Sequence, residues 1–150
     1  MIYGIGTDIV AVKRLIALWR RHGALAAGKI LTKDEQTDFF ALFPRVPVSE
    51  SGAAEEEKLA RRENEKAGRF LARRWAAKEA FAKALGTGIL TPASLSNIGV
   101  AHNAAGAPTF AFAPELAGKL AQMGISASFL SLSDEREYAV AFAVLESRQR

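Results

Sequence analysis

The apolar residues of this chain are spaced for strands in some stretches and for helices in others. Residues 2–10 (IYGIGTDIV) are rich in β-branched side chains, which predicts a strand. Residues 11–22 then carry apolar side chains at helical spacing, which predicts an amphipathic helix. One carboxylate, Asp8, interrupts the strand. Because an unpaired buried carboxylate is costly, either Asp8 faces solvent or a positive group lies beside it, such as a basic side chain, a helix amino terminus or a metal ion.

Two more helices are predicted in the middle of the chain. The run LTKDEQTDFFALF begins with Thr32, a suitable N-cap, and Glu35 three residues later completes a capping box. The run AGRFLARRWAAKEAFAKALGTG, residues 67–88, is rich in residues of high helix propensity. Gly86 is a natural C-cap for this long helix.

The segment between these helices, about residues 44–66, has a different composition. Pro44 and Pro47 end the preceding helix, and the following VSESGAAEEEKLARRENEK is highly charged with almost no apolar periodicity. We expect an exposed insertion with little function, either partly disordered or folded as an isolated, solvated helix.

The remainder of the chain is dominated by strand signals. Strands are predicted in NIGVAH, GAPTFAF, SASFLSLS and EYAVAFAVLE, with a short helix from Pro114 and a tight turn at DER between the last two strands. The expected fold class is therefore α+β, with about five strands and four helices. We predict an antiparallel or mixed sheet packed on one long central helix, in a single domain of residues 1–150.

Composition excludes several kinds of site. The 150 residues are 49% hydrophobic and 24% charged, as in ordinary globular proteins. The chain has no cysteine and only two histidines, His22 and His102, which excludes disulfides, thiolate catalysis, cysteine zinc sites and histidine-rich metal sites. No targeting segment or membrane-spanning run is visible, so a cytoplasmic location is expected.

The positive charge is concentrated in two segments. Residues 11–31 contain five basic residues and no acidic one, and residues 67–88 contain five basic residues against one acid. Such clustering suggests an anionic partner: a phosphorylated ligand, an acidic protein or nucleic acid. The alternative is that both segments are solvated helix faces.

The long helix carries the residues best suited to chemistry. Glu79 and Lys83 lie four residues apart and therefore share a face. They form either an ordinary surface ion pair or, with Arg74 and Lys78, a carboxylate set among phosphate-binding bases. The GTG that follows is either a helix C-cap or a backbone segment that approaches a phosphate closely.

Three motifs taken together resemble one family. GIGTDIV near the amino terminus, FLARRWAAKEAFAKALGTG in the centre and SLSDEREYAVAFAVLE near the end, in this order, are similar to the holo-acyl-carrier-protein synthases. These are small phosphopantetheinyl transferases of bacterial lipid and fatty acid synthesis. ILTKDE and NAAGAP also fit the family. The resemblance covers almost the whole chain outside residues 44–66 and implies the phosphopantetheinyl transferase fold.

The resemblance also implies a reaction and a site. The family transfers 4′-phosphopantetheine from coenzyme A to a serine of a carrier protein and releases adenosine 3′,5′-bisphosphate. In the family, the residues that match Asp8 and Glu79 bind Mg²⁺, whose preference for oxygen ligands explains two neighbouring carboxylates. With these two, Lys83 completes the implied catalytic set. The implied coenzyme A contacts are Arg74, Lys83, Gly86 and Thr87. The serine proton passes either to Glu79 or to a magnesium-bound water.

The implied partners are an acidic acyl carrier protein and further copies of this chain. The first basic helix offers Arg14, Arg20 and Arg21 for docking the carrier, or else is a solvated face. The family forms trimers with shared active sites, whereas the sequence by itself also allows a monomer. Two positions depart from the common family pattern: Asp134, where many relatives carry histidine, and Ala107, where lysine is common.

Two other functions are weighed against this one. The first is a phosphopantetheinyl transferase that acts on the carrier domains of large synthases. The second is a basic module that binds nucleic acid, but the chain lacks a recognisable nucleic-acid motif and its aromatic residues are not interleaved with the basic ones. We therefore expect neither a nucleic-acid nor a membrane partner.

Overall fold

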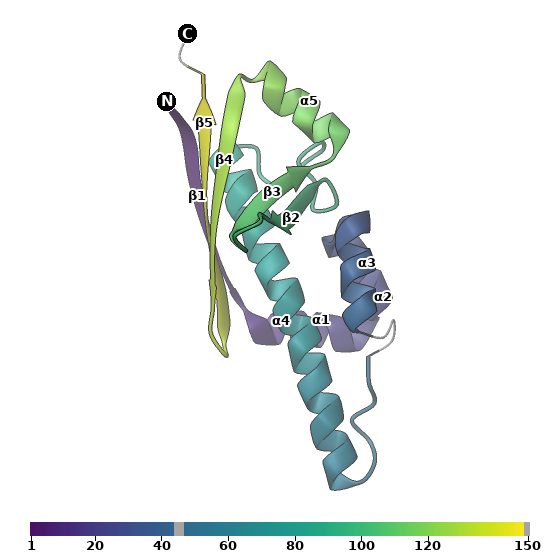
Figure 1. Cartoon of the computed structure of the whole chain (residues 1–150). Helices are drawn as coiled ribbons and strands as arrows, with labels where there is room; N and C mark the ends of the chain where they lie inside the picture. Colours follow the sequence, from purple (N-terminus) through teal and green to yellow (C-terminus); the bar gives the residue numbers. More distant parts are fainter. Residues whose placement is uncertain (44–46, 149–150) are drawn as a thin grey trace.

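The structure, a computed structural model, describes residues 1–43 and 47–148. Within this part of the chain, helices and strands are arranged around one long helix (Figure 1). In chain order the elements are β1 (Ile2–Ala11), α1 (Val12–His22), α2 (Ala24–Ile30), α3 (Lys33–Leu42), α4 (Ala54–Leu85), β2 (Ile98–His102), β3 (Pro108–Phe112), α5 (Pro114–Gln122), β4 (Ile125–Asp134) and β5 (Tyr138–Ser147).

The strands form two sheets, and every described pairing is antiparallel. In the three-stranded sheet β5 lies between β1 and β4, and β2 pairs with β3 in the smaller sheet. Asp8 of β1 lies opposite Ala141 of β5, which lies opposite Leu132 of β4. The predicted α+β class and the long central helix are confirmed. Of the two predicted sheet types, antiparallel and mixed, the structure has the antiparallel one.

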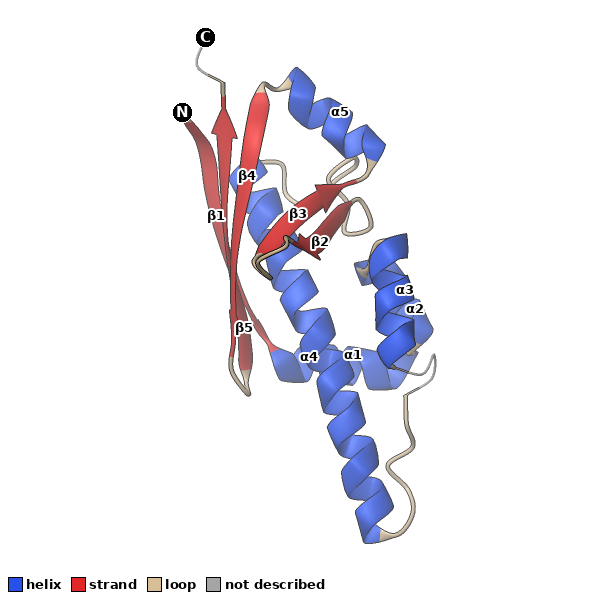
Figure 2. Cartoon of the chain, viewed as in Figure 1, coloured by secondary structure: helices blue, strands red, loops and turns tan. Residues whose placement is uncertain are grey.

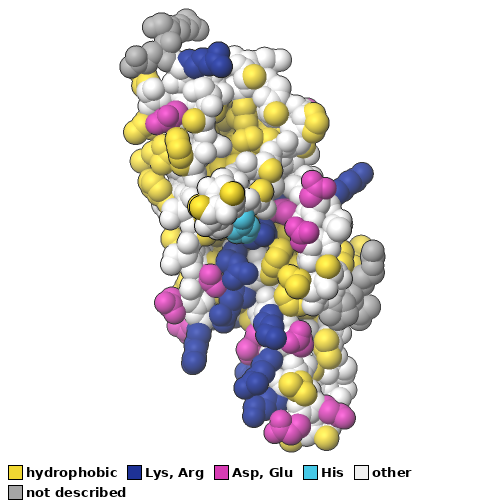
Figure 3. Space-filling view, in the orientation of Figure 1, with side chains coloured by type: hydrophobic (Ala, Val, Ile, Leu, Met, Phe, Trp, Pro, Cys, Tyr) yellow, Lys and Arg dark blue, Asp and Glu magenta, His cyan; other side chains and the backbone are white. Residues whose placement is uncertain are grey.

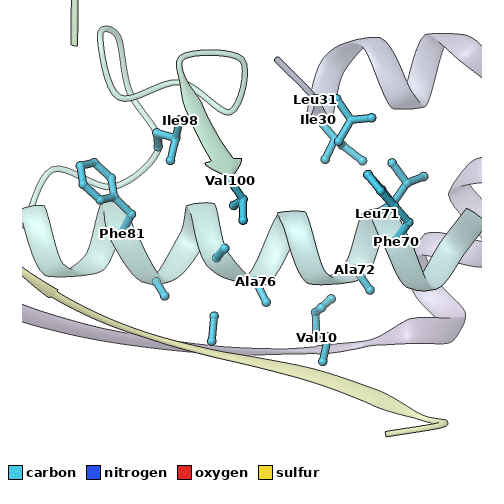
Figure 4. Close-up of a cluster of buried hydrophobic side chains, with 14 of the residues drawn as sticks. Val10, Ile30, Leu31, Phe70, Leu71, Ala72, Ala76, Phe81, Ile98 and Val100 are labelled. Carbon is cyan, nitrogen blue, oxygen red and sulfur yellow. The ribbon is translucent and has the colours of Figure 1, made fainter. Parts of the chain in front are cut away.

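Helix α4 lies between two layers. The three-stranded sheet covers one side, helices α2 and α3 with the β2–β3 sheet lie on the other, and α1 crosses behind α4 from the end of β1 (Figure 2). Ala72 and Ala76 point toward Val10 on the sheet side, whereas Phe81 points toward Ile98 on the opposite side (Figure 4). All five side chains belong to one buried cluster. The small side chains on the sheet side let the strands approach the helix backbone closely.

Local sequence signals predicted several element boundaries correctly. Thr32 caps α3: its hydroxyl accepts a hydrogen bond from the Glu35 amide, and the Glu35 carboxylate accepts one from the Thr32 amide. Gly86 ends α4 with φ 81°, a left-handed conformation that glycine adopts without strain. One helix was missed. The seven-residue α2 follows Gly23 directly and has no side-chain cap that could have marked it.

The charged insertion is more closely packed than its sequence pattern predicts. Residues 54–66 are the first turns of α4 and most of them are exposed, so the solvated helix is confirmed there, but it is continuous with the long helix and is not isolated. The Asn64 side chain is buried; it accepts hydrogen bonds from Trp19 Nε1 (3.3 Å) and the Val48 amide (3.1 Å), and donates one to the Val48 carbonyl (2.9 Å). Residues 47–53 are thereby held against α1 and α4. Residues 44–46 lie outside the described part of the chain.

The outer face of the three-stranded sheet is apolar and uncovered in this chain. Alternate residues of a strand point to opposite faces, so the residues of β1 with odd numbers face away from α4. The exposed apolar side chains that we assign to this face, each at least 36% accessible, are Tyr3, Ile5, Ile9, Phe129, Tyr138, Val140 and Phe142. A patch of this kind is typical of a protein–protein interface. Among the described residues, no helix has the length and apolarity needed to cross a membrane.

Candidate active site

Two glycines allow β1 to touch the carboxyl-terminal half of α4. A Cβ at Gly4 would collide with the carbonyl of Ala84, and one at Gly6 with the carbonyl of Ala80. Any larger residue at either position would push the strand off the helix. The same face of β1 continues with Asp8, two residues after Gly6, so the close approach places this carboxylate beside α4.

Lys83 is the basic partner of Asp8. Its Nζ donates to Asp8 Oδ1 at 2.8 Å and to the Thr7 carbonyl at 3.0 Å. The pair is open to solvent: the Lys83 side chain is 51% exposed and the Asp8 side chain 15%. The carboxylate inside the strand is therefore neither unpaired nor deeply buried, and it keeps an accessible side at the edge of the sheet.

Glu79 adds a second carboxylate to this pair. Burial raises the pKa of Glu79, and the Asp8 charge raises it further, against the opposing effects of Lys83 and Arg14. The two carboxylates are thus close enough to repel each other. Lys83 offsets part of this repulsion, which leaves the site suited to a further cation.

The donor set of the site fits a magnesium ion that is shared with a substrate. Asp8 and Glu79 offer hard carboxylate oxygens, which Mg²⁺ prefers, and Mg²⁺ is commonly held by one or two carboxylates together with water and substrate phosphates. Within the described residues, no group of three or more His, Cys, Asp and Glu side chains could hold a metal. The fit is therefore to an ion bound jointly by two carboxylates and a ligand, and the described part of the chain provides no closed metal cage.

The end of α4 lies next to this cluster along the helix. Gly86 and Gly88 have positive φ values, 81° and 67°, and neither has any atom near the place where a Cβ would lie. Thr87 between them is exposed, and its hydroxyl donates to the Gly88 carbonyl at 3.1 Å. Gly86 therefore serves as the helix cap, which is one of the two roles that the sequence allowed for the GTG. The backbone of the turn is open, and its contact with a phosphate stays a prediction.

A second charged cluster lies on another side of α4 and is buried. Lys78 is completely inaccessible and donates to Glu35 Oε2 (2.6 Å), the Ile30 carbonyl (2.6 Å) and the Leu95 carbonyl (2.8 Å). Burial lowers the pKa of Lys78 to about 8, although Glu35 opposes the shift. All three donors of the ammonium are used inside the protein. The interpretation of Lys78 as a phosphate-binding base is therefore wrong.

Arg74 belongs to this buried cluster as well. Its Nε lies 3.2 Å from Glu35 Oε1, and its guanidinium lies over the Phe70 ring, 4.4 Å from the centroid. It lines a groove of about 810 Å³ between α3 and the β2–β3 sheet. Arg74 therefore lies apart from the Asp8–Glu79 pair within one chain, and its contact with coenzyme A stays a prediction.

The three arginines expected to dock a carrier lie in different surroundings. Arg14 lies with its guanidinium carbon 5.8 Å from the centre of the Trp75 ring and is close enough to Glu79 to affect its pKa. Arg20 pairs with Glu50 at 3.0 Å, so the insertion occupies it in part. Arg21 is exposed. Only Arg14 lies beside the carboxylate pair.

Sequence reasoning missed the buried role of Glu35. The capping box identified this residue as a helix-start signal, but its other partners, Lys78 and the Val100 amide (2.9 Å), are 43 and 65 residues away. One signal in the sequence could have indicated that Lys78 turns inward. Ala77 precedes it and Phe81 lies one helical turn after it, so part of its helix face is apolar.

The chain is similar over nearly its whole length to proteins of one known family. The model of the 4′-phosphopantetheinyl transferase superfamily matches residues 4–143. Holo-[acyl-carrier-protein] synthase from Dechloromonas aromatica (strain RCB) is 47% identical over 146 residues, which cover 97% of this chain and 98% of that protein.

Solved structures agree with this similarity. The crystal structure of holo-[acyl-carrier-protein] synthase from Neisseria meningitidis superposes with a TM-score of 0.80 at 44% identity and covers 98% of this chain and 100% of its own. The Bacillus anthracis holo-(acyl-carrier-protein) synthase, in complex with CoA (3′,5′-ADP), has a TM-score of 0.69 at 30% identity and covers 99% of each chain.

Proposed function

Because the chain belongs to the 4′-phosphopantetheinyl transferase superfamily, as an enzyme of the holo-[acyl-carrier-protein] synthase type, we propose that it converts apo to holo acyl carrier protein. The 4′-phosphopantetheine group of coenzyme A is transferred to a serine of the carrier, and adenosine 3′,5′-bisphosphate is released. The product is a carrier ready for fatty acid synthesis. The observation that carries this proposal is the open Asp8–Glu79 carboxylate pair with Lys83 bound to it.

The proposed reaction is a phosphoryl transfer. The serine oxygen attacks the pantetheine-side phosphorus of the coenzyme A pyrophosphate and forms a new P–O bond, while the bond to the bridging oxygen breaks. Negative charge develops on the leaving phosphate, so positive groups near the pyrophosphate lower the barrier. The serine proton leaves as the new bond forms, and either Glu79 or water accepts it.

Asp8 and Glu79 are the proposed ligands of Mg²⁺, which would supply charge neutralisation and orientation of the pyrophosphate oxygens. Burial and, second, the Asp8 charge raise the pKa of Glu79, and both effects would be relieved by a cation bound at this point. Lys83 holds Asp8 in place and keeps half of its side chain exposed. Among the lysines of α4, Lys83 is the one that we propose contacts the pyrophosphate of coenzyme A.

The turn after α4 and Arg74 are the proposed remaining contacts of coenzyme A. Gly86 and Thr87 follow Lys83 within four residues and present open backbone on the same end of the helix. Arg74 points toward a different groove. Its contact with coenzyme A therefore fits best if the ligand reaches it from a neighbouring copy of the chain.

The uncovered sheet face supports a homotrimer with shared active sites. Apolar side chains on this face are stabilised when another surface covers them. Further copies of the same chain can provide that surface, because they carry the same apolar face. The variant Phe142→Lys places a charge in the middle of the face, on the central strand. We expect light scattering to report a trimer for the natural chain and a monomer for this variant. A natural chain that stays monomeric at micromolar concentration would end the trimer proposal.

Intact-mass spectrometry tests the function directly. Apo acyl carrier protein is incubated with the chain, coenzyme A and Mg²⁺, beside a reaction that contains EDTA. We expect a phosphopantetheine-sized mass gain on the carrier, lost in EDTA. No gain on a competent carrier would contradict the proposed function. A gain that persists in EDTA would contradict only the metal requirement.

A further inference from the structure

A groove of about 480 Å³ lies where α1, α4 and the turn between β4 and β5 meet. Three basic side chains line it, each from a different element: Lys13 from α1, Arg69 from α4 and Arg136 from the turn. None of the three forms an ion pair or hydrogen bond with another described residue. Free cations gathered from three elements indicate a surface that meets an anionic partner.

The acidic side chains of the groove do not cancel this charge. Glu65 and Glu137 also line it, but Glu65 is already paired with Arg61 at 3.4 Å. In Figure 3, Lys and Arg side chains gather over the lower half of the molecule, along the protruding half of α4 and near the β4–β5 turn. Acidic side chains lie among them on the extension of α4, where residues 54–66 hold five Glu and four Lys or Arg, so this segment adds no net positive charge to the groove.

The groove is separate from the carboxylate pair but lies near it. Ala11, which lines the groove, follows Asp8 by three residues of β1, or roughly 10 Å along a strand. Arg69 precedes Glu79 by ten residues of α4, or roughly 15 Å along a helix. A protein bound at the groove therefore reaches the site, while the groove itself holds no reacting group.

The groove is also continuous with the exposed face of α1. Lys13, Ala17 and Arg21 are all exposed and follow one another at intervals of four residues, so they share one side of that helix. This stripe starts in the groove and runs roughly 12 Å along α1. A basic surface of this length, lined also by the carboxylates of Glu65 and Glu137, suits the mixed but mainly acidic surface of a protein better than a compact phosphate group.

We infer that the groove of Lys13, Arg69 and Arg136 is a docking surface for an acidic segment of the acceptor protein, and that it extends the α1 face toward the β4–β5 turn. This inference rests on the proposed function, because it takes the acyl carrier protein as the acceptor. The inference gives Arg69 of α4 and Arg136 of the β4–β5 turn a role in binding the carrier. Neither residue belongs to the carboxylate pair or to the proposed coenzyme A contacts.

Charge reversal tests the inference. Arg136→Glu and Arg69→Glu are compared with Lys119→Glu, the same kind of change at an exposed position of α5, which lies far from the groove (Figure 1). Initial rates are measured with carrier varied at saturating coenzyme A, and then with coenzyme A varied. We expect each groove variant to raise the apparent KM for carrier by about fivefold or more, with kcat and the KM for coenzyme A within about twofold. Lys119→Glu should change none of these constants.

Two kinetic results would overturn the inference. A raised KM for coenzyme A with an unchanged KM for carrier would assign the groove to the nucleotide. Constants unchanged in both groove variants would show that nothing docks there. Raising salt from about 0.02 M to about 0.2 M should weaken carrier use by the natural chain more than by Arg136→Glu, since the reversed charge no longer contributes attraction.

A binding measurement separates this inference from the proposed function. Apo acyl carrier protein is titrated calorimetrically into the natural chain, Arg136→Glu and Lys119→Glu, without coenzyme A. We expect weaker binding only for Arg136→Glu, by about fivefold or more. Equal affinities, or no binding to the natural chain, overturn the docking surface. If binding behaves as expected but no transfer occurs, the proposed function fails and the docking surface stands.

Discussion

Helix α4 carries two lysine–carboxylate pairs that differ in how completely the protein satisfies them. Lys78 lies 2.6 Å from Glu35, and both side chains are buried, at 0% and 5% exposure. Lys83 lies 2.8 Å from Asp8, with side chains 51% and 15% exposed. The two lysines lie five positions apart in the sequence, so they point about 140° apart around the helix. Distances alone would make these pairs equivalent.

The difference between the pairs is the number of unused binding groups. Every donor of Lys78 has a partner in the protein, and Glu35 accepts from Lys78, the Thr32 amide and the Val100 amide. At the open pair, the second carboxylate oxygen of Asp8 has no hydrogen-bond partner among the described residues, and Glu79 lies close by with its pKa raised. A saturated pair holds elements together, whereas an unsaturated pair is free to bind a ligand.

The largest expected effect comes from neutralising the open carboxylates. Asp8→Asn and Glu79→Gln should each lower kcat/KM for transfer by at least about 10³-fold, because the cation and the pyrophosphate lose a ligand. The melting temperature should stay within a few degrees, since removing one charge also removes the repulsion between the two carboxylates. The transfer assay and calorimetry measure both. Glu115→Gln on α5 is the matched control, and near-normal turnover in either site variant would refute the assignment.

The next effect is on stability and comes from the buried pair. Lys78→Met removes the ammonium and leaves the Glu35 carboxylate buried near Arg74 without its closest partner. Breaking a buried ion pair from one side costs about 3–5 kcal/mol. Denaturant titration should show a loss of this size in the free energy of unfolding. A loss below about 1 kcal/mol would mean that the cluster does not hold α3 and α4 together.

The same substitution at the open pair sharpens the comparison. Lys83→Met should lower the free energy of unfolding by less than about 1 kcal/mol, because exposed pairs contribute little. Its effect should fall on transfer, with kcat/KM lowered by about 10–100-fold through loss of a phosphate contact. Both lysine variants are measured in one denaturation series and one rate series. Equal stability losses would erase the distinction between the two pairs.

The smallest expected effect lies at the border of the open site. Arg14→Gln should raise the apparent KM for carrier by about fivefold, since a basic residue beside the carboxylates meets the incoming acidic protein. Arg20→Gln should have less effect, because Glu50 already occupies Arg20. Kinetics with carrier varied measure this order. A larger effect for Arg20 than for Arg14 would reverse the docking assignment.

Much of the secondary structure could be predicted because its signals are local. The capping box at Thr32 involves two residues three positions apart, and the Gly86 cap depends on one residue that tolerates a positive φ. The expectation that the insertion is isolated was wrong because its attachment to the rest of the chain depends on a distant contact. Asn64 is buried only because Trp19 and Val48, 45 and 16 residues away, bind it.

The candidate site divides in the same way. The sequence by itself determined that Glu79 and Lys83 share one helix face, since helical spacing suffices for that. The roles of Asp8, Glu79 and Lys83 toward a cation and a phosphate came from the resemblance to the holo-acyl-carrier-protein synthases, and they stay predictions. Only the tertiary structure decided that Lys78 turns into the core while Lys83 stays open. Both are lysines of one helix, and their roles depend on which distant elements cover each side of it. Burial is a property of packing between elements, and no local pattern encodes the partner that supplies it.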